Sequence, residues 1–391
     1  MRRNYREMLV AIVVLALMLP VRALPAQQPD SAMLRPSLAL LFDGSAYGQD
    51  QASKKQIGVV PPTGHMRTNR LILDGILKAP TPFAYSMSVD YNGIEHPDKT
   101  AFSLTDLAII VPISKLLDVS LGRQKEGVTE QMMSSTRVIA LTERAAPITA
   151  FLPTRNDGLR LGIGDAPHGR LSLGWFHPVP SINGPVPDGS NQAAGRVFFT
   201  PVLKDDESRV FQFGASARWT GAIDGTSRFR SRPEQDEAPY VVDTDKFPSR
   251  GATMLGLETL VQQGALSIEA EGLVTRATVI DSAAATFPAY FIQASWRPGG
   301  EIRTYDARNG TLTRVRLRGH ATWELATRYS HTDLTSESVA GGVLDLASAA
   351  ASWYPARTLR LTGDYGYSVL RRGGTTGRLQ LGTLRATWDW R

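Results

Sequence analysis

The feature of this sequence that most constrains its fold is a two-residue alternation of side chains that recurs in short segments. In the segment ATWELATRYSHTDL (321–334), bulky Trp323 and Leu325 alternate with charged Glu324 and Arg328. Successive side chains of a strand point to opposite faces, so such a segment has one apolar face and one charged face. The same alternation appears in 85–90, 117–122, 159–164, 211–219, 266–271, 290–296, 359–367 and 384–390. The pattern predicts an all-β chain of many short strands.

The N-terminus carries the pattern of a segment that is removed during export. A basic start precedes the apolar run 8–19, which is too short to span a bilayer. The small residues Ala23 and Ala26 follow, as at the cleavage site of a secretory signal peptide. We therefore expect residues 1–26 to be a signal peptide and residues 27–391 to form the mature domain. An N-terminal membrane anchor is the alternative.

Removal of the signal peptide changes what the charge of the chain implies. The basic residues fall from 43 to 39 and the acidic residues from 37 to 36, which leaves a net charge of +3. A charge this small is no argument for nucleic-acid binding, and we expect no nucleic-acid partner. Arginine supplies 31 of the 39 basic residues, and its planar fork of donors suits oxyanions. A coding bias toward high GC content would produce the same excess of arginine.

The length of the mature chain and the spacing of its turn and loop sequences are typical of a membrane β-barrel. It contains no apolar run of 18 residues, and no linker or repeat divides it into soluble domains. Turn sequences such as RPGGE (297–301), RNGT (308–311) and RRGGTTGR (371–378) alternate with long polar stretches such as 177–196 and 224–250. Dividing roughly 365 residues by about 22 for each strand with its connection gives about sixteen strands.

Aromatic residues near the ends of the apolar faces favour a barrel over a soluble β-sandwich. The inner face of a sandwich is packed and its outer face is polar, so it has no reason to place rings at strand ends. Aromatic rings end the apolar faces here at Trp219, Trp296, Tyr329, Trp353, Tyr354, Tyr365, Tyr367, Trp388 and Trp390. Such rings are enriched where a membrane meets water. The apolar faces are therefore expected to meet lipid, and the charged faces a water-filled interior too wide for side chains to fill.

Seven longer segments of the mature chain, taken in order, resemble those of a known protein family. They are LRPSLALLFDGSAYGQD (34–50), HMRTNRLILDGIL (65–77), LGRQKEGVTEQMMSSTRVIALTERA (121–145), FLPTRNDGLRLGIG (151–164), GRVFFTP (195–201), PAYFIQASWRPGGEIRTYDARNGTLTRV (288–315) and the segment 323–355. In this order they resemble the phosphate-selective porin O and P family of bacterial outer membranes, over nearly the whole mature chain. Two departures stand out: the family's paired arginines are separated here as Arg67 and Arg70, and aromatic Trp390 is followed by Arg391.

The resemblance implies a sixteen-stranded trimeric barrel with an inward-folded constriction loop. The protein would be exported through the periplasm to the outer membrane, where it would contact lipid and assemble as a homotrimer. It would pass small inorganic anions, phosphate or polyphosphate among them, by diffusion. A general porin without anion preference and an outer-membrane barrel enzyme are the alternatives.

The segment 121–158 lacks clear alternation and is rich in cations. Its candidates for the anion pathway are Arg123, Lys125, Arg137, Arg144 and Arg155. Cations around a pore lower the electrostatic barrier to an anion, so we expect part of this segment to fold inward and to place several of them at the constriction. The alternative is that they only hold the loop, with Arg144 paired to Glu143 or another wall carboxylate and Lys125 paired to Glu126.

A second group of arginines lies on the charged faces of the predicted strands. It comprises Arg160, Arg218, Arg328, Arg360 and Arg385. These side chains could form a ladder that guides anions along the interior. The alternative is an ordinary network of ion pairs with the carboxylates of the same faces, which are Glu269, Glu271, Glu324, Asp364 and Asp389.

Enzymatic chemistry finds little support in the sequence. The six histidines show no metal-ligand spacing, and the glycine-containing segments lack the context of a phosphate loop. The chain has no cysteine, which excludes disulfides, thiolate metal sites and a cysteine nucleophile. His331 beside Thr332 and Asp333 could be imagined in a hydrolase, although a histidine at a strand end is the simpler interpretation. We expect no catalytic, cofactor-binding or metal-binding residues.

Overall fold

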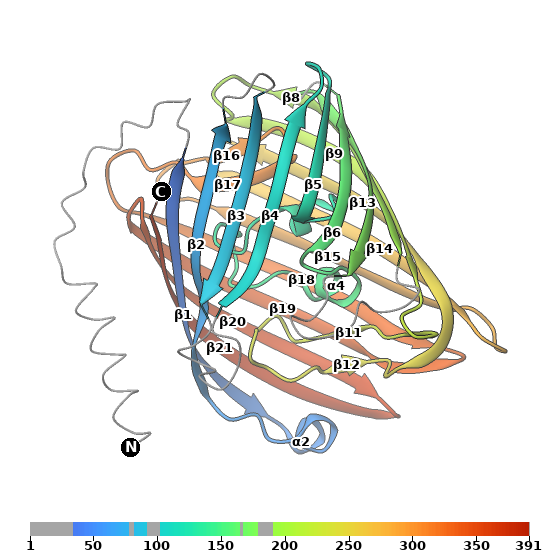
Figure 1. Ribbon diagram of the computed structural model, residues 1–391. Coiled ribbons are helices and arrows are strands. Elements are labelled where there is room, and N and C mark those ends of the chain that lie inside the picture. The colour runs from blue at the N-terminus through green and yellow to red at the C-terminus, as the bar shows by residue number, and fades with distance from the viewer. Residues whose placement is uncertain (1–33, 78–81, 92–101, 165–166, 179–190, 391) are drawn as a thin grey trace. The chain divides into compact units, whose positions relative to one another are not determined.

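The computed structural model describes residues 34–77, 82–91, 102–164, 167–178 and 191–390. The predicted signal peptide and Arg391 lie outside the described residues. Sixteen strands form the wall of a barrel (Figure 1). They are β1 (Arg35–Gln49), β2 (Thr63–Leu77), β3 (Phe83–Tyr91), β4 (Phe102–Pro112), β5 (Leu117–Gln124), β6 (Asn156–Ile163), β7 (Gly169–Pro178), β8 (Gln192–Leu203), β9 (Arg209–Gly221), β13 (Phe247–Gln263), β14 (Leu266–Val279), β15 (Ala285–Trp296), β18 (Thr322–Ser336), β19 (Val339–Ala356), β20 (Leu359–Arg372) and β21 (Thr375–Trp390).

The strands pair in chain order, and the sheet closes on itself. Each wall strand is antiparallel to the next one, including the pairs β9–β13 and β15–β18 that skip short elements. β21 pairs with β1, from Leu38 opposite Trp390 to Gln49 opposite Leu379. Closure leaves no unpaired edge, which a sheet in lipid requires because the bilayer offers no hydrogen bonds to the backbone. The predicted strand number and the all-β barrel class are confirmed.

The remaining elements are short and lie in the connections. The helices are α2 (Gln51–Ile57), α3 (Glu130–Met133) and α4 (Ala146–Phe151), and the small strands are β10 (Thr226–Ser227), β11 (Arg230–Ser231), β12 (Val242–Asp243), β16 (Arg303–Asp306) and β17 (Thr311–Val315). None of these three helices of the described chain has the length and apolar composition of a membrane span.

The two ends of the barrel differ in their connections. The end at which β1 starts and β21 finishes, here called the terminal end, has connections as short as 264–265 and 357–358. The opposite end, here called the loop end, carries the long connections 125–155 and 222–246. The longest connections are mostly at the loop end, as predicted for a barrel with two different ends, but residues 297–321 form a long connection at the terminal end. The loop end also has the short turns 337–338 and 373–374. The tight turn predicted at RPGGE is present, with the N–H of Gly300 donating to the carbonyl oxygen of Arg297 at 3.0 Å, and it begins this connection.

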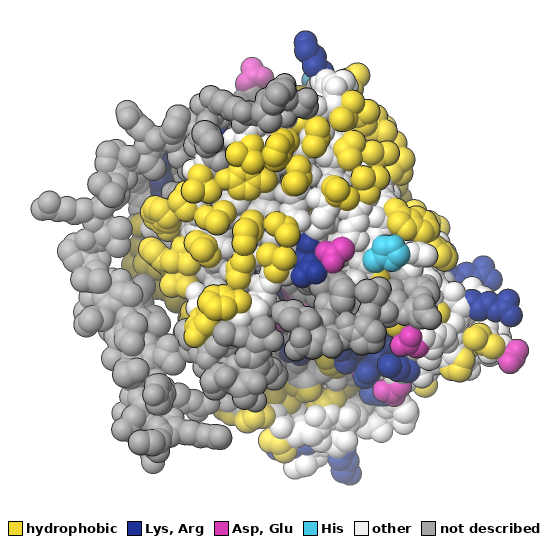
Figure 2. Space-filling view, in the orientation of Figure 1, with side chains coloured by type: hydrophobic (Ala, Val, Ile, Leu, Met, Phe, Trp, Pro, Cys, Tyr) yellow, Lys and Arg dark blue, Asp and Glu magenta, His cyan; other side chains and the backbone are white. Residues whose placement is uncertain are grey.

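The opening segment of the sequence has the two faces that its alternation predicts. On β18, Trp323 and Leu325 are 51% and 42% exposed, whereas Glu324 and Arg328 are buried in the interior. Figure 2 shows hydrophobic side chains spread over the outer surface of the strands that face the viewer. Among the predicted aromatic residues Tyr354 is the exception, because its hydroxyl donates inward to Glu324 Oε2 at 2.8 Å.

The outward position of Leu325 gives a direct test of the lipid-facing surface. Leu325→Arg should lower the free energy of unfolding by about 1–3 kcal/mol in lipid vesicles, because an arginine that faces lipid costs about 2–4 kcal/mol at the middle of the bilayer and less toward its surface. Leu325→Ala separates this cost from the loss of the leucine side chain. Denaturant titration of the refolded protein measures both. Equal stability of the two variants would show that position 325 does not meet lipid.

Candidate permeation pathway

The connection 125–155, here called loop 3, crosses the barrel interior. It leaves the wall between β5 and β6 and is held on the other side by strands far along the chain. The backbone N–H of Glu130 donates to Glu258 on β13, and that of Gln131 donates to Glu271 on β14, at 2.9 and 2.6 Å. Further along the loop, the Thr142 hydroxyl donates to an oxygen of Asp364 on β20 at 2.7 Å. The predicted inward fold of this segment is present in the structure.

Two predicted cations of loop 3 converge on one backbone carbonyl. Lys125 Nζ donates to the carbonyl oxygens of Met133 and Ser134 at 2.6 and 2.9 Å, and Arg144 Nη2 donates to that of Ser134 at 2.6 Å. The expected alternative pairs, Arg144 with Glu143 and Lys125 with Glu126, do not occur among the described contacts. Both side chains hold the loop, and neither positive charge is cancelled by a carboxylate bound to it.

Burial alters the protonation of these two cations to different degrees. Burial lowers the pKa of Arg144 to about 10, with the nearby charge of Arg155 acting in the same direction. Arg144 therefore remains a cation at neutral pH. Burial also lowers the pKa of Lys125 well below its usual value, and the charges of Arg144 and Arg155 add to the effect.

The other cations predicted in 121–158 are divided between the two sides of the wall. Arg137 donates to Asp389 at 3.0 Å and Arg155 forms a two-point ion pair with Asp106 at 3.0 Å, both inside the barrel. Arg123 is different. It stands opposite Leu107, whose side chain is exposed on the outer surface, and it forms a two-point ion pair with Asp157 at 2.9 and 3.0 Å.

The position of Arg123 corrects its proposed role. β5 continues to Gln124, so the two-residue alternation carries Arg123 to the same outer face as Leu121. Residues directly opposite each other in a sheet share a face, which also places Asp157 outside. Arg123 is therefore not a lining residue of the pathway.

A second inward segment, residues 297–321, enters from the terminal end. Its side chain Arg303 donates to both carboxylate oxygens of Glu324 at 2.8 and 2.6 Å, and Arg297 donates to the same carboxylate at 3.1 Å. Arg303 also donates to the carbonyl oxygen of Val138 in loop 3. Glu324 was predicted to pair with neighbours on the wall. Tyr354 of the wall does donate to it, but its ion pairs are with this inward segment.

A third inward segment, residues 222–246, is here called loop 5 and enters from the loop end. Glu234 lies 3.2 Å from Arg328 Nη1 and accepts a hydrogen bond from the N–H of Ala146, at the start of α4, at 2.9 Å. Burial raises the pKa of Glu234 although the charge of Arg328 opposes it. Loop 5 thus links the wall to loop 3.

The wall arginines resolve into two groups. Arg218 pairs with Glu126 at 2.6 Å, Arg328 with Glu234, and Arg385 with Asp43 at 2.6 Å. These pairs form an ion network, as the alternative predicted, but their carboxylates belong to the loops and to β1 and are not the wall carboxylates that were expected. Arg160 and Arg360 have no carboxylate partner among the described contacts; Arg160 donates to the carbonyl oxygen of Lys125 at 3.4 Å and Arg360 to that of Ile139 at 2.7 Å.

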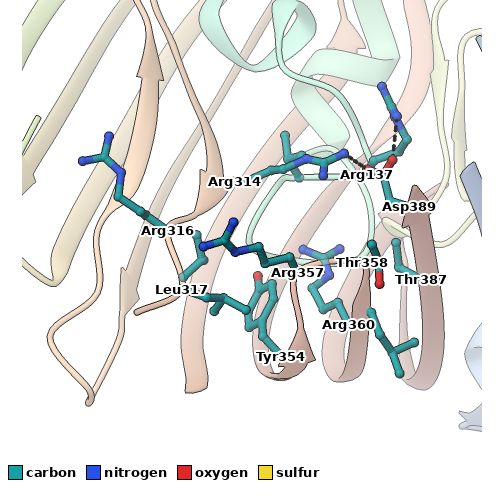
Figure 3. Close-up of a pocket in the computed structure, with 13 residues that line it drawn as sticks. Arg137, Arg314, Arg316, Leu317, Tyr354, Arg357, Thr358, Arg360, Thr387 and Asp389 are labelled. Carbon is teal, nitrogen blue, oxygen red and sulfur yellow. Dashed lines mark hydrogen bonds and ion pairs between the residues drawn. The ribbon is translucent and has the colours of Figure 1, made fainter. Parts of the chain in front are cut away.

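A pocket of about 290 Å³ at the terminal end, here called the arginine pocket, gathers five arginines (Figure 3). Its basic lining residues are Arg137, Arg314, Arg316, Arg357 and Arg360, and its acidic lining residue is Asp389. Asp389 pairs with Arg137 and Arg314, and Arg316 pairs with Glu207. The positive charge of the pocket thus exceeds the negative charge of its lining.

Arg360 is the side chain in this pocket whose bonding is incomplete. It is 4% exposed, and Nη1 donates to the carbonyl oxygen of Ile139. Nε and Nη2 are buried and have no hydrogen-bond partner within the described part of the protein. Arg357 lines the pocket beside it, as Figure 3 shows, without an ion pair among the described residues. Buried guanidinium donors without partners favour an anion close to them.

A second pocket, of about 310 Å³, lies on the other side of Arg137. Arg137 lines both pockets, and the second one is also lined by Lys125, Arg155 and Arg160. A further pocket of about 430 Å³ at the loop end is lined by Arg218, Arg228, Arg230 and Lys246. The interior therefore presents cations at both ends and in the middle.

The structure separates His331 from Thr332, the hydroxyl of the hydrolase alternative. The imidazole Nδ1 lies 2.8 Å from Asp345 Oδ1, and the ring stacks on Tyr290 at 5.1 Å, both on the outer face. Thr332, the next residue of β18, is fully buried on the inner face. The two side chains point to opposite sides of the wall, so they cannot act on one substrate.

The sequence and the fold were compared with those of known proteins. The family model of the phosphate-selective porins O and P matches residues 46–376. No curated protein sequence matches the chain.

Solved structures with the same fold are outer-membrane porins. An anion-selective porin from Comamonas acidovorans superposes with a TM-score of 0.56 at 11% identity, over 90% of this chain and 99% of that one. The outer-membrane channel DcaP of Acinetobacter baumannii gives 0.55 at 11% identity, over 91% and 97%. The trimer form of OmpT from Vibrio cholerae gives 0.56 at 10% identity, over 92% and 100%. At these identities the likeness shows the fold. Together with the family match, it establishes that this chain is a bacterial outer-membrane porin and belongs to the phosphate-selective porin O and P family.

Proposed function

We propose that the channel prefers anions and that its interior is suited to tetrahedral oxyanions such as phosphate or polyphosphate. The observation that carries this proposal is the bonding of Arg360, whose Nε and Nη2 are buried in the arginine pocket with no hydrogen-bond partner among the residues that the structure describes. A phosphate oxygen would accept from a guanidinium in the geometry that this side chain prefers.

The distribution of the other cations supports the same preference. Arg137 lies between two pockets, and Arg144 has no bound carboxylate among the described residues. An anion that leaves one group of cations therefore meets the next. A pore needs sites that are attractive enough to admit an ion and weak enough to release it, and several moderate sites meet both needs.

The comparisons with known proteins support an anion channel but do not identify the anion. The family is named for phosphate selectivity, and one structural neighbour is described as an anion-selective porin. Another neighbour is described in a trimer form, which favours a homotrimer for this chain as well. We infer a channel without catalytic activity or a cofactor, in contact with outer-membrane lipid.

Competition between anions in single-channel recording tests the proposal. In potassium chloride the current should be carried mainly by chloride, and adding phosphate should reduce it. Pyrophosphate should reduce it more strongly, because it presents more oxyanion charge to the same arginines. A reversal potential near zero in a salt gradient, with a current that ignores phosphate, would instead identify a general porin.

A further inference from the structure

Loop 5 brings two carboxylates to a histidine of the wall. His65 lies on β2 near the loop end, and it is 7% exposed. Asp236 is partly exposed and Glu237 is exposed, so the cluster can be reached from water. One ligand atom from each of the three residues lies within 4.8 Å of the other two. A single small ion could therefore touch all three.

The imidazole of His65 has no hydrogen bond to any of the described residues. Both ring nitrogens are buried without a partner in this part of the chain, which is uncommon for a buried polar group. The nearest carboxylate oxygen, Asp236 Oδ2, is 3.8 Å from Nε2, too far for a hydrogen bond. Two ligands of a tetrahedral zinc ion with bonds of about 2.0–2.1 Å lie roughly 3.3 Å apart, so this spacing fits two ligands of one metal better than a donor and its acceptor.

The two arginines nearest the cluster have carboxylate partners of their own. Arg67 Nε lies 3.4 Å from Asp236, but Arg67 donates to both oxygens of Glu143 at 2.7 and 3.1 Å. Arg385 is bound to Asp43, which stands opposite His65 on β1, and to Glu143. These two arginines and two carboxylates balance one another. Asp236 and Glu237 add two carboxylates beside His65, whose charge a divalent cation would offset.

The segment that carries the two carboxylates is fixed against the wall. Gln235, directly before Asp236, is 2% exposed. Its side chain accepts from the Tyr47 hydroxyl at 2.7 Å and donates to the Ser45 hydroxyl at 2.9 Å, both on β1. The carboxylates are therefore held beside β2 by contacts that do not involve a metal, as a preorganised site requires.

We propose that His65, Asp236 and Glu237 bind one divalent transition-metal ion of the zinc class. An imidazole with two carboxylates is a donor set for zinc and its neighbours, whereas calcium and magnesium prefer oxygen ligands alone. The bound ion joins loop 5 to β2 and places positive charge at the loop end of the channel. The site is independent of the anion preference proposed above.

Zinc titration of the full-length protein tests the site. Untagged protein, folded in detergent and treated with a chelator, should bind one Zn²⁺ per chain in isothermal titration calorimetry. His65→Gln and Asp236→Asn should each weaken binding at least tenfold, because each removes one of three ligands. Cobalt should give the visible absorption bands of a site with nitrogen and oxygen ligands. Calcium should bind at least tenfold more weakly than zinc.

A matched control comes from another histidine–carboxylate contact. His320 Nε2 lies 3.4 Å from Glu301 Oε1, but His320 is in no cluster of three metal-ligating side chains among the described residues. His320→Gln should leave zinc binding unchanged. The folded state of every variant is checked by its shift in electrophoretic mobility on heating. Binding that survives in folded His65→Gln and Asp236→Asn, equal affinity for calcium, or no binding by the wild type would each overturn the proposal.

Discussion

Replacing Arg357 and Arg360 together with glutamate should reverse the ion preference of the channel from anions to cations. The double change adds four negative charge units to a pocket of about 290 Å³ whose lining has one acidic residue. Two unit charges about 6 Å apart interact by about 3 kcal/mol at an effective dielectric constant near 20, and salt reduces this by a modest amount over such distances. The permeability ratio of chloride to potassium should therefore fall at least tenfold.

Reversal potentials in a potassium chloride gradient measure this change. Arg276→Glu is the matched control, because Arg276 is exposed on the outer face of β14 and the substitution changes charge in the same sense away from the interior. The double change to glutamine should give an intermediate ratio, since it removes positive charge without adding negative charge. If the glutamate variant folds and keeps the wild-type reversal potential, the arginine pocket does not set the ion preference.

The second large effect is expected on stability, from Arg385→Met. The Arg385 side chain is fully buried, and it donates to both oxygens of Asp43 at 2.6 Å, to Glu143 at 2.7 Å and to the carbonyl oxygen of Thr142. Removing one partner of a buried ion pair typically costs about 3–5 kcal/mol, because the remaining charge stays buried without its counterion. The variant should lose about this much free energy of unfolding.

Denaturant titration of protein refolded into lipid vesicles measures the loss. Arg276→Met removes an exposed arginine of the outer face and should change stability far less than Arg385→Met. Adding Asp43→Asn to Arg385→Met should restore part of the stability, because the unpaired carboxylate is then removed as well. A loss below about 1 kcal/mol for Arg385→Met would show that water, rather than the arginine, compensates Asp43.

The charge of Glu143 shows how loop 3 depends on this network. Burial acts to raise the pKa of Glu143, but the charges of Arg67 and Arg385 outweigh it and hold the pKa below its usual value. Glu143 is thus a carboxylate at neutral pH. Its ion pairs fasten the far part of loop 3 to β2 and β21, which keeps Arg137 and Arg144 in the interior.

The sequence by itself determined the wall of this protein. Alternation in segments such as 211–219 and 384–390 predicted strands that the structure contains, and the chain length predicted sixteen of them. The reason is local. Side chains alternate every two residues, and a shift of register by one residue would turn Arg328 toward lipid and Leu325 toward water. The requirement that apolar side chains face the lipid therefore restricts the register of each strand.

Tertiary structure alone decided what happens inside the wall. The face on which a side chain lies depends on whether its residue still belongs to the strand. Arg123 lies within β5 and points outward, whereas Lys125, two residues later, belongs to loop 3 and points inward. The carbonyl oxygen of Ser134, rather than a nearby carboxylate, accepts hydrogen bonds from Lys125 and Arg144. Long segments 222–246 and 297–321 supply partners for Arg328 and Glu324 that no spacing along the chain indicates.

The physical reason is that burial requires partners for charges but does not specify which ones. Many pairings of arginine with carboxylate or carbonyl satisfy that requirement about equally well, so the fold of the loops selects among them. His65 and Asp236 are also far apart in the sequence, so their spacing does not indicate the cluster that loop 5 forms with β2. Local alternation fixed the strands and their faces, whereas contacts between distant segments decided which cations keep their charge available to an ion.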